Sequence, residues 1–323
     1  MNLFATVLTY PAPSANYRGE SELNRTVIQK ITDGRWDYPI ISPEAMRNAL
    51  REILAGPKYR LPSNRSRLHD EEQLAVRFSD LPDPDRYVDD FFFGYLVATS
   101  NADRKKTKKE LEEKRGKAAA ERFTFKRDSI LRMNLARALQ PYRHNAVFTQ
   151  SPLAAEGSAY RNSTSSALLH RETAVTAFQY PFALNLDECK GKPEWTRALL
   201  RAVGELNDVA GNHARSYFEM APASIVVRLT RSLVAGYETY GFRIDADPKD
   251  GQNQTHRFPE VIGGIPLGDY PGSEFFIGGK IVKDMPDVEQ KKLADKGVTL
   301  DRDPRRLLEV VADKAGLPKP KEG

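Results

Sequence analysis

Apolar residues recur along the chain at two spacings, one typical of β-strands and one typical of α-helices. Strand-like patterns cover residues 3–9, 173–186 and 223–230, where apolar and β-branched residues gather. Helical spacing covers residues 193–209 and 304–315. The pattern therefore predicts a sheet whose strands are far apart along the chain, with helices packed between them.

Two further segments have helical spacing. Their apolar positions are Met46, Leu50, Ile53 and Leu54 in the first, and Ile130, Met133, Leu135, Ala138 and Leu139 in the second. We expect a helix at each, with the apolar stripe buried.

Polar insertions interrupt this pattern. Residues 56–90 are rich in proline and charge, and residues 103–117 carry eight basic and four acidic side chains with one large apolar residue. Such a charge run is typical of a solvated helix or a mobile loop. Residues 148–171 are polar and weakly patterned, which indicates a projecting arm or a long hairpin. Residues 263–279 are expected to alternate glycine turns with short strands.

The order of elements favours an α+β fold. A strand, a helix and a strand are followed, after long insertions, by a second strand, helix and strand. This order fits a modified RNA-recognition or ferredoxin-like sheet with additions.

The strongest functional pattern lies on the helix that begins near Ser42. Ser42 can cap this helix, and Pro43 suits its first position. The apolar stripe leaves Arg47, Asn48 and Arg51 together on the opposite face. Two guanidiniums one turn apart, beside a helix N-terminus, suit a run of phosphates. The segment therefore predicts a clamp for a phosphate backbone.

Two other polar stretches offer candidate RNA contacts. One follows the opening strand, and the other precedes the strand at 223–230. Their members are Asn16, Tyr17, Arg18 and Arg25 in the first stretch, and His213 and Arg215 in the second. Amides and guanidiniums donate to phosphates, while the Tyr17 ring can stack on a base. Tyr17 could equally be a core residue, and His213 could be satisfied by a local hydrogen bond.

Composition limits the class of protein. The chain has 323 residues and 40% hydrophobic content, enough for one large domain with insertions or for two smaller ones. Its net charge of +5 and pI near 9.1 favour polyanionic partners. It has no apolar run of membrane-spanning length, and its first residues do not resemble a secretory signal. We expect a cytoplasmic protein without a membrane partner.

No motif for catalysis or cofactor binding is found in the sequence. The single cysteine, Cys189, excludes an internal disulfide and a cysteine-rich zinc site, and the five histidines are scattered. Gly278-Gly279-Lys280 lacks the spacing of a phosphate loop, and residues 263–268 do not fit the dinucleotide fingerprint. We therefore expect no catalytic residues, no metal and no other cofactor.

Three segments resemble one known family, the DevR-type branch of the seventh Cas family. They are Pro-Ala-Pro-Ser-Ala-Asn-Tyr-Arg-Gly-Glu at 11–20 with Asn24-Arg25, Ile-Ser-Pro-Glu-Ala-Met-Arg-Asn-Ala-Leu-Arg at 41–51, and Gly-Asn-His-Ala-Arg at 211–215 leading to Pro222. This family belongs to the RAMP superfamily and supplies the repeated backbone subunit of type I CRISPR Cascade complexes, here most similar to type I-B. The similarity is spread over about residues 1–230, and the segment at 41–51 is the most specific.

The resemblance implies a subunit shaped like a hand. Residues 1–55 would form the N-terminal part of a palm with the clamp helix, and residues 56–127 a helical fingers insertion. Residues 128–147 would add a palm helix, and residues 148–171 a β-hairpin thumb. Residues 172–323 would complete the palm.

The resemblance also implies a function. Several copies of such a subunit line up in a helical filament along one guide crRNA, with other Cascade subunits, and present the guide to a target DNA strand. Backbone contacts would come from Ser42, Arg47 and Arg51, and also from Asn16, Arg18 and Arg25 in the preceding loop. In this family the thumb displaces a guide base at regular intervals. Candidates for the displacing residue are Leu153, Tyr160 and Leu168.

Two alternative functions remain open. A type III-like backbone subunit uses the same fold to cleave target RNA with a loop aspartate near the first helix, and Asp33 lies in roughly that stretch. Next to Gly34, however, Asp33 is also typical of a turn. The second alternative is a DNA-binding regulator, although the sequence has no helix-turn-helix pattern.

Overall fold

The computed structural model describes residues 1–14, 17–22, 25–68, 75–150, 168–209, 217–246 and 254–319. Within these residues, the largest sheet has nine strands and is antiparallel except for the pair β20–β21. Its spatial order is β21 (Thr299–Asp301), β20 (Phe275–Gly279), β17 (Ser224–Thr230), β1 (Asn2–Leu8), β16 (Phe178–Asn185), β12 (Ala136–Ala138), β6 (Trp36–Ile41) and β5 (Lys30–Asp33), with β11 (Leu131–Met133) also paired to β16.

The strand β1 is the centre of this sheet. It pairs with β16 on one side and with β17 on the other, so that Leu3 faces both Leu184 and Leu229. Leu3, Ala5 and Val7 point into the main core because successive strand residues alternate between faces. Leu8 points into a second core on the other face. A strand buried on both faces cannot alternate cleanly with polar residues, and this explains the apolar run at the start of the chain.

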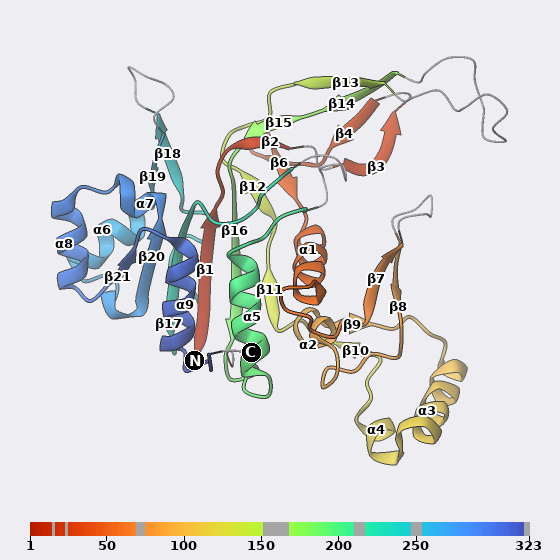
Figure 1. The fold of residues 1–323 in the computed structure, drawn as a ribbon. Coiled ribbons are helices and arrows are strands. Elements are labelled where there is room, and N and C mark those ends of the chain that lie inside the picture. The colour runs from red at the N-terminus through yellow and green to blue at the C-terminus, as the bar shows by residue number, and fades with distance from the viewer. Residues whose placement is uncertain are drawn as a thin grey trace.

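Helices cover both faces of the sheet. One face carries α1 (Pro43–Ala55), α5 (Pro193–Val203) and α9 (Pro304–Lys314), which share a core with β1, β16 and β17. The second core gathers α6 (Pro259–Leu267), α7 (Lys280–Asp284) and α8 (Asp287–Asp295) near β20 and β21, as Figure 1 shows. A short ribbon, β18 (Arg243–Ala246) with β19 (Gln254–Arg257), and a 3-10 helix at Gly272–Glu274 complete this end.

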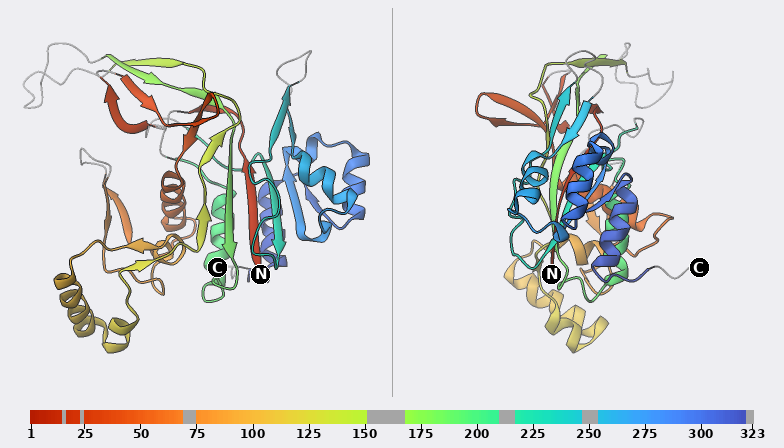
Figure 2. Two further views of the ribbon diagram at one scale, coloured as in Figure 1. Left: turned by 180° about the vertical axis from the view of Figure 1, so that it is seen from behind. Right: turned by 90° about the vertical axis from the view of Figure 1, so that its left-hand side faces the viewer.

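An arm projects beyond the end of the central sheet (Figure 2). It is a four-stranded sheet in the order β13 (Ala146–Gln150), β14 (Leu168–Glu172), β4 (Arg25–Ile28) and β3 (Tyr17–Glu22). At its base, β2 (Ala12–Ser14) pairs with β15 (Ala174–Thr176). The arm therefore joins residues near the N-terminus to residues more than a hundred positions later.

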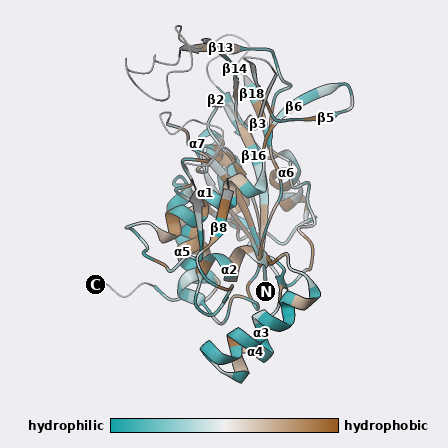
Figure 3. Cartoon of the chain, turned by 90° about the vertical axis from the view of Figure 1, so that its right-hand side faces the viewer, coloured by the Kyte–Doolittle hydropathy of each residue, from teal (hydrophilic) through white to brown (hydrophobic). Residues whose placement is uncertain are grey.

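A second extension lies on the same side of the central sheet as the arm, with α1 between the two (Figure 1). It contains β7 (Arg65–Leu68), β8 (Ala75–Phe78), α2 (Val88–Phe93), β9 (Tyr95–Leu96), α3 (Asn101–Arg115), α4 (Lys117–Arg122) and β10 (Lys126–Arg127). Leu111 is the one buried residue of α3, and most of this helix is hydrophilic in Figure 3. Of the two structures expected for residues 103–117, a solvated helix or a mobile loop, the solvated helix is the one formed, up to Arg115.

The predicted helix within residues 128–147 is wrong. The chain there forms the short strands β11 and β12, which pair with β16. Leu131 and Met133 are buried while Arg132 between them is exposed, which is the two-residue period of a strand. Local spacing fits both structures here, and the edge offered by β16 decides between them.

The glycine turns predicted near residue 263 are also wrong. Gly263 and Gly264 lie inside α6. A Cβ on Gly264 would come within 2.7 Å of the Tyr270 ring, so this glycine allows a close packing contact and makes no turn.

Gly279 offers a test of the fold. Its φ is +94°, and a Cβ there would collide with the carbonyl oxygen of Ala223. We expect Gly279→Ala to lower the free energy of unfolding by more than about 2 kcal/mol, because backbone strain adds to the steric clash. Gly191→Ala is the control, since its Cβ would meet nothing within 4 Å. Equal chemical denaturation midpoints for the two variants would contradict this reading of Gly279.

Candidate nucleic-acid interface

The N-terminus of α1 is built as the sequence predicts. The backbone N–H of Ala45 donates to the Ser42 hydroxyl at 3.2 Å, and Pro43 occupies the first helical position. Met46, Leu50 and Leu54 are fully buried in the main core. The predicted cap and apolar stripe are confirmed.

Arg47 lies on the part of α1 that solvent can reach. Its side chain is 24% exposed, and its closest ion pair within the described residues joins Nη1 to Glu44 at 3.8 Å. Burial lowers the pKa of the Arg47 guanidinium; the carboxylate of Glu44 opposes this shift, and the positive charge of Arg65 adds to it. An anion placed here would relieve the cost of holding this charge away from water.

Arg51 is not on the exposed face where the sequence analysis places it. Its side chain is only 5% exposed, and its guanidinium donates to the side-chain oxygen of Asn48. The amide of Asn48 in turn donates to Glu52 at 3.3 Å. Helical spacing alone did not reveal this burial, because α2 and α5 both pack against α1. Of the three predicted polar side chains, Arg47 is the one left for a ligand.

The arm brings together two sets of predicted residues. In register, Arg25 on β4 lies opposite His170 on β14, and β3 with Tyr17 and Arg18 pairs with β4. Leu168 begins β14. For Tyr17, Arg18, Arg25 and Leu168 the structure describes only the backbone. The remaining candidates, Asn16, Leu153, Tyr160, His213 and Arg215, lie outside the described residues.

A row of rings on the arm was missed by the sequence analysis. Phe148 and His170 face each other across β13 and β14 with ring centroids 4.8 Å apart. The His144 ring lies 6.1 Å from that of His170, and the Tyr142 ring 6.4 Å from that of His144. Phe148 is 63% exposed, so bases could stack on this row. The signal in the sequence was the presence of His144 and Phe148 at even spacing within one segment. His170 lies beside them only because β14 pairs with β13.

A buried carboxylate fixes the arm to the central sheet. Glu172 on β14 accepts hydrogen bonds from Lys30 Nζ at 3.1 Å and from the backbone N–H of Ile28 at 3.3 Å. The same ammonium lies 4.2 Å from the centre of the Tyr142 ring. Partners from three chain segments meet here, which no local pattern could indicate. This cluster links the arm to β5 of the central sheet.

Asp33 lies in a hairpin turn and forms an ion pair. It ends β5 directly before the two-residue turn to β6, where Gly34 has a φ of +62°. Its carboxylate lies 2.9 Å from Nη1 of Arg137. The Arg137 guanidinium also lies over the rings of Tyr38 and Tyr240, at 5.2 and 5.4 Å. Asp33 therefore holds the β5–β6 hairpin to β12.

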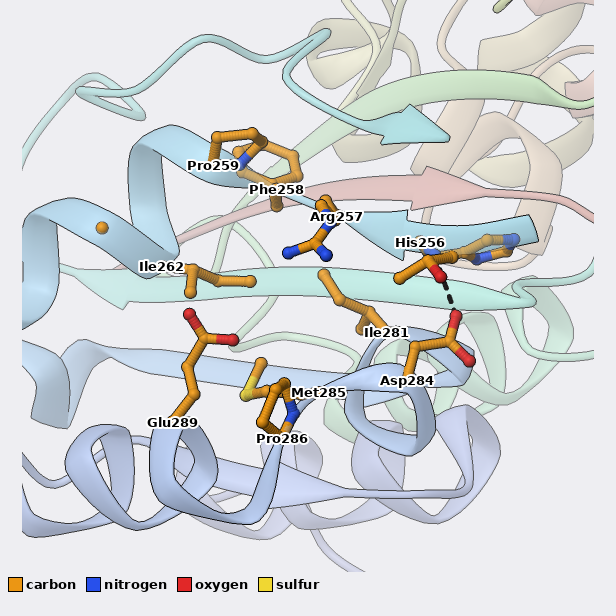
Figure 4. Close-up of a pocket in the computed structure, with 12 residues that line it drawn as sticks. His256, Arg257, Phe258, Pro259, Ile262, Ile281, Asp284, Met285, Pro286 and Glu289 are labelled. Carbon is orange, nitrogen blue, oxygen red and sulfur yellow. Dashed lines mark hydrogen bonds between the residues drawn. The ribbon is translucent and has the colours of Figure 1, made fainter. Parts of the chain in front are cut away.

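A small pocket of about 240 Å³ near the second core is lined by His256 and Asp284 among other residues (Figure 4), and His256 also contacts a serine outside the lining. The Ser224 hydroxyl lies 2.8 Å from Nδ1 of His256 and also accepts a hydrogen bond from the backbone N–H of Ile281. Asp284 accepts from the backbone N–H of His256, so no carboxylate orients the imidazole. These contacts hold β17, β19 and α7 together.

Three further observations concern the cysteine, metal binding and membrane-spanning helices. Burial raises the pKa of the Cys189 thiol to about 11, which keeps it protonated. Across the described residues, no group of three or more histidine, cysteine, aspartate or glutamate side chains could hold a metal ion. None of the helices in the described ranges is long and apolar enough to cross a membrane.

The burial of His256 predicts a pH dependence of stability. Burial lowers the pKa of His256 from 6.5 to about 4, and the charge of Lys280 adds to this effect. The unfolded chain therefore binds a proton first, so stability is complete above about pH 6.5 and declines towards pH 4, by roughly 3 kcal/mol in all. We expect urea unfolding of His256→Asn to lack this component, while His144→Asn retains it. Parallel curves for wild type and His256→Asn between pH 7 and 5 would contradict the prediction.

Comparison with known proteins supports one family. No protein-family model matches the chain. A protein of Myxococcus xanthus (strain DK1622) described as "CRISPR-associated protein Cas7/Cst2/DevR" is 28% identical over 308 residues, which is 91% of each chain.

Solved structures agree in fold. One chain of a "CRISPR RNA-guided surveillance complex" superposes with a TM-score of 0.51 and 11% identity, and one of a "CRISPR RNA-guided surveillance complex, pre-nicking" with 0.53 and 13%. Each match covers 98% of this chain and 100% of the other. The predicted resemblance is confirmed: the chain has a mixed α+β fold and is similar in sequence to a Cas7/Cst2/DevR protein.

Proposed function

We propose that this chain is a repeated backbone subunit that binds guide crRNA in a Cascade surveillance complex and presents it for pairing with target DNA. One observation carries the proposal. The similarity to a Cas7/Cst2/DevR protein and the fold shared with chains of RNA-guided surveillance complexes both extend over more than nine tenths of the chain.

The palm of this subunit would be an RNA-recognition-type sheet. The strands β17, β1, β16 and β11 are neighbours in that order, and β11 is antiparallel to β16 as β1 is. The helices α1 and α5 pack together on one face. Two split β-α-β units, β1–α1–β11 and β16–α5–β17, interlock in this way, which is the ferredoxin-like arrangement.

The helix α1 would hold the RNA backbone. Arg47 supplies a positive charge whose ion pair with Glu44 is long, at 3.8 Å. Ser42 caps the first turn of α1, and the backbone amides of that turn lie beside Arg47. Arg51 would act indirectly, through its hydrogen bond to Asn48. Contacts of this kind do not read sequence, so one protein can carry any guide while base pairing selects the target.

The two extensions would act as thumb and fingers. The arm around β13 and β14 corresponds to the thumb at 148–171, and the extension with β7, β8, α3 and α4 to the fingers at 56–127. Both project from the same side of the central sheet, with α1 between them (Figures 1 and 2). The ring row from Tyr142 to Phe148 would stack on bases that pass the arm.

The complex would include several copies of this chain in a helical filament, other Cascade subunits, and the target DNA strand held through the guide. It would be cytoplasmic. The subunit would bind without catalysing, because the charge of Asp33, the candidate for an RNA-cleaving variant, is compensated by Arg137.

Purification tests the proposal directly. The chain expressed with its partner subunits and a CRISPR array should retain RNA of one uniform length, because copies packed along a guide protect a fixed number of nucleotides. RNA extracted from the purified complex can be sized on a denaturing gel. A preparation free of RNA, or one with RNA of random lengths, would contradict the proposal.

Arg47 provides a test at the level of one residue. We expect Arg47→Ala to weaken single-stranded RNA binding by about tenfold, since a charged hydrogen bond to phosphate contributes about 1.5 kcal/mol or more. Lys314→Ala, which removes an exposed charge from α9, is the control and should bind as wild type does. Equilibrium binding at fixed salt and a thermal melt of each variant are the measurements. Unchanged affinity of a folded Arg47→Ala protein would disprove the clamp.

A further inference from the structure

A polar cavity of about 600 Å³ lies at the end of the central sheet where β1 finishes and α9 begins. Its wall contains Tyr10, which follows β1, and Lys283 on α7. Arg302 and Arg305, on either side of the start of α9, also line it. Cavities of this size hold small molecules or single nucleotides. The predicted RNA contacts do not include any of these residues.

The acidic side chains of this cavity already have partners. Glu205 accepts from Lys58 Nζ at 2.6 Å, and Glu219 accepts from the hydroxyl of Tyr217. Asp303 caps α9 by accepting from the backbone N–H of Arg305. Each of these carboxylates thus has a hydrogen-bond donor within the protein, and a cationic ligand would have to displace these contacts.

The basic side chains of this cavity have fewer partners than the acidic ones. Throughout the described part of the chain, no carboxylate lies within ion-pair distance of Lys283 or Arg302, and Arg305 reaches only Asp303, at 3.8 Å. Lys283, Arg302 and Arg305 are all exposed. Among the described residues, the cavity thus presents two exposed cations without an ion pair, Lys283 and Arg302, which suit a phosphate.

Tyr10 adds an aromatic wall to the same cavity. Tyr10 is 53% exposed, although it lies two residues after the buried end of β1. A large ring held at the rim of a cationic cavity can stack on a nucleobase while the cations hold the adjoining phosphate.

We propose that this cavity binds one nucleotide of a single RNA strand, with the phosphate at Lys283 and Arg302 and the base against Tyr10. The inference rests on the proposed function and adds a second contact to the one at Arg47. Because β1 ends and the arm begins at the same end of the central sheet, an RNA strand could pass from the arm to the cavity (Figure 1).

The salt dependence of RNA binding tests the phosphate contacts. For single strands, each phosphate contact contributes about 0.7 to the slope of log K against log salt concentration. Lys283→Gln with Arg302→Gln should reduce the slope of the full-length protein by about 1.4 for a short oligoribonucleotide. The matched control is Lys291→Gln with Lys292→Gln, which removes two exposed charges from α8 and should leave the slope unchanged. Tyr10→Leu should weaken binding about fivefold or more at an unchanged slope, because stacking involves no counterions.

The outcomes separate this inference from the function on which it rests. If the wild-type protein binds no RNA, both fail. If it binds RNA and both double variants keep the wild-type slope, the cavity assignment alone is wrong. Titration with adenosine 5′-monophosphate distinguishes the source of the nucleotide: binding that the Lys283/Arg302 variant loses, without a change in RNA slope, would assign the cavity to a free nucleotide and overturn the proposal.

Discussion

The pairing of β1 with β16 and β17 is the constraint on which the rest of the structure depends. It joins residues 2–8 to residues 178–185 and 224–230, and it lets side chains on both faces of β1 reach a core. The segments between these strands either add strands to the same sheet, as β5, β6, β11 and β12 do, or leave it and return. The long insertions therefore emerge as extensions from a fixed frame, and the ends of the central strands become the natural place for loops that bind ligands.

The arm depends on a second, smaller constraint. A buried carboxylate costs much free energy unless it is paired, so Glu172 requires the ammonium of Lys30 and the amide of Ile28. These partners tie β14 to the segment between β4 and β5. The strands that carry Arg25 and His170 are thereby kept in register, and two polar stretches that looked unrelated in the sequence become one surface.

The local pattern of apolar and polar residues predicted the elements whose burial depends on a single segment. The cap at Ser42, the apolar stripe of α1, the solvated α3 and the strands β1 and β17 all follow from spacing within one segment. It failed where a distant partner decides the outcome. Residues 131–133 and 136–138 form strands because they pair with β16, and Arg51 is buried although helical spacing places it on the polar face. The ring row and the Glu172 cluster could not be found from sequence, since their members meet only across paired strands.

Counting basic residues says little about function in this molecule, because pairing decides what each one can do. Arg197 is fully buried and bound by Glu309 and Asp313, so it joins α5 to α9 and has no capacity for a ligand. Arg228 is likewise held by Glu274. A phosphate can compete only for a cation whose charge is not already compensated and which solvent can reach. By that criterion Arg47 and Lys283 stand apart from the structural arginines, although in the sequence all of them contribute equally to the same net charge.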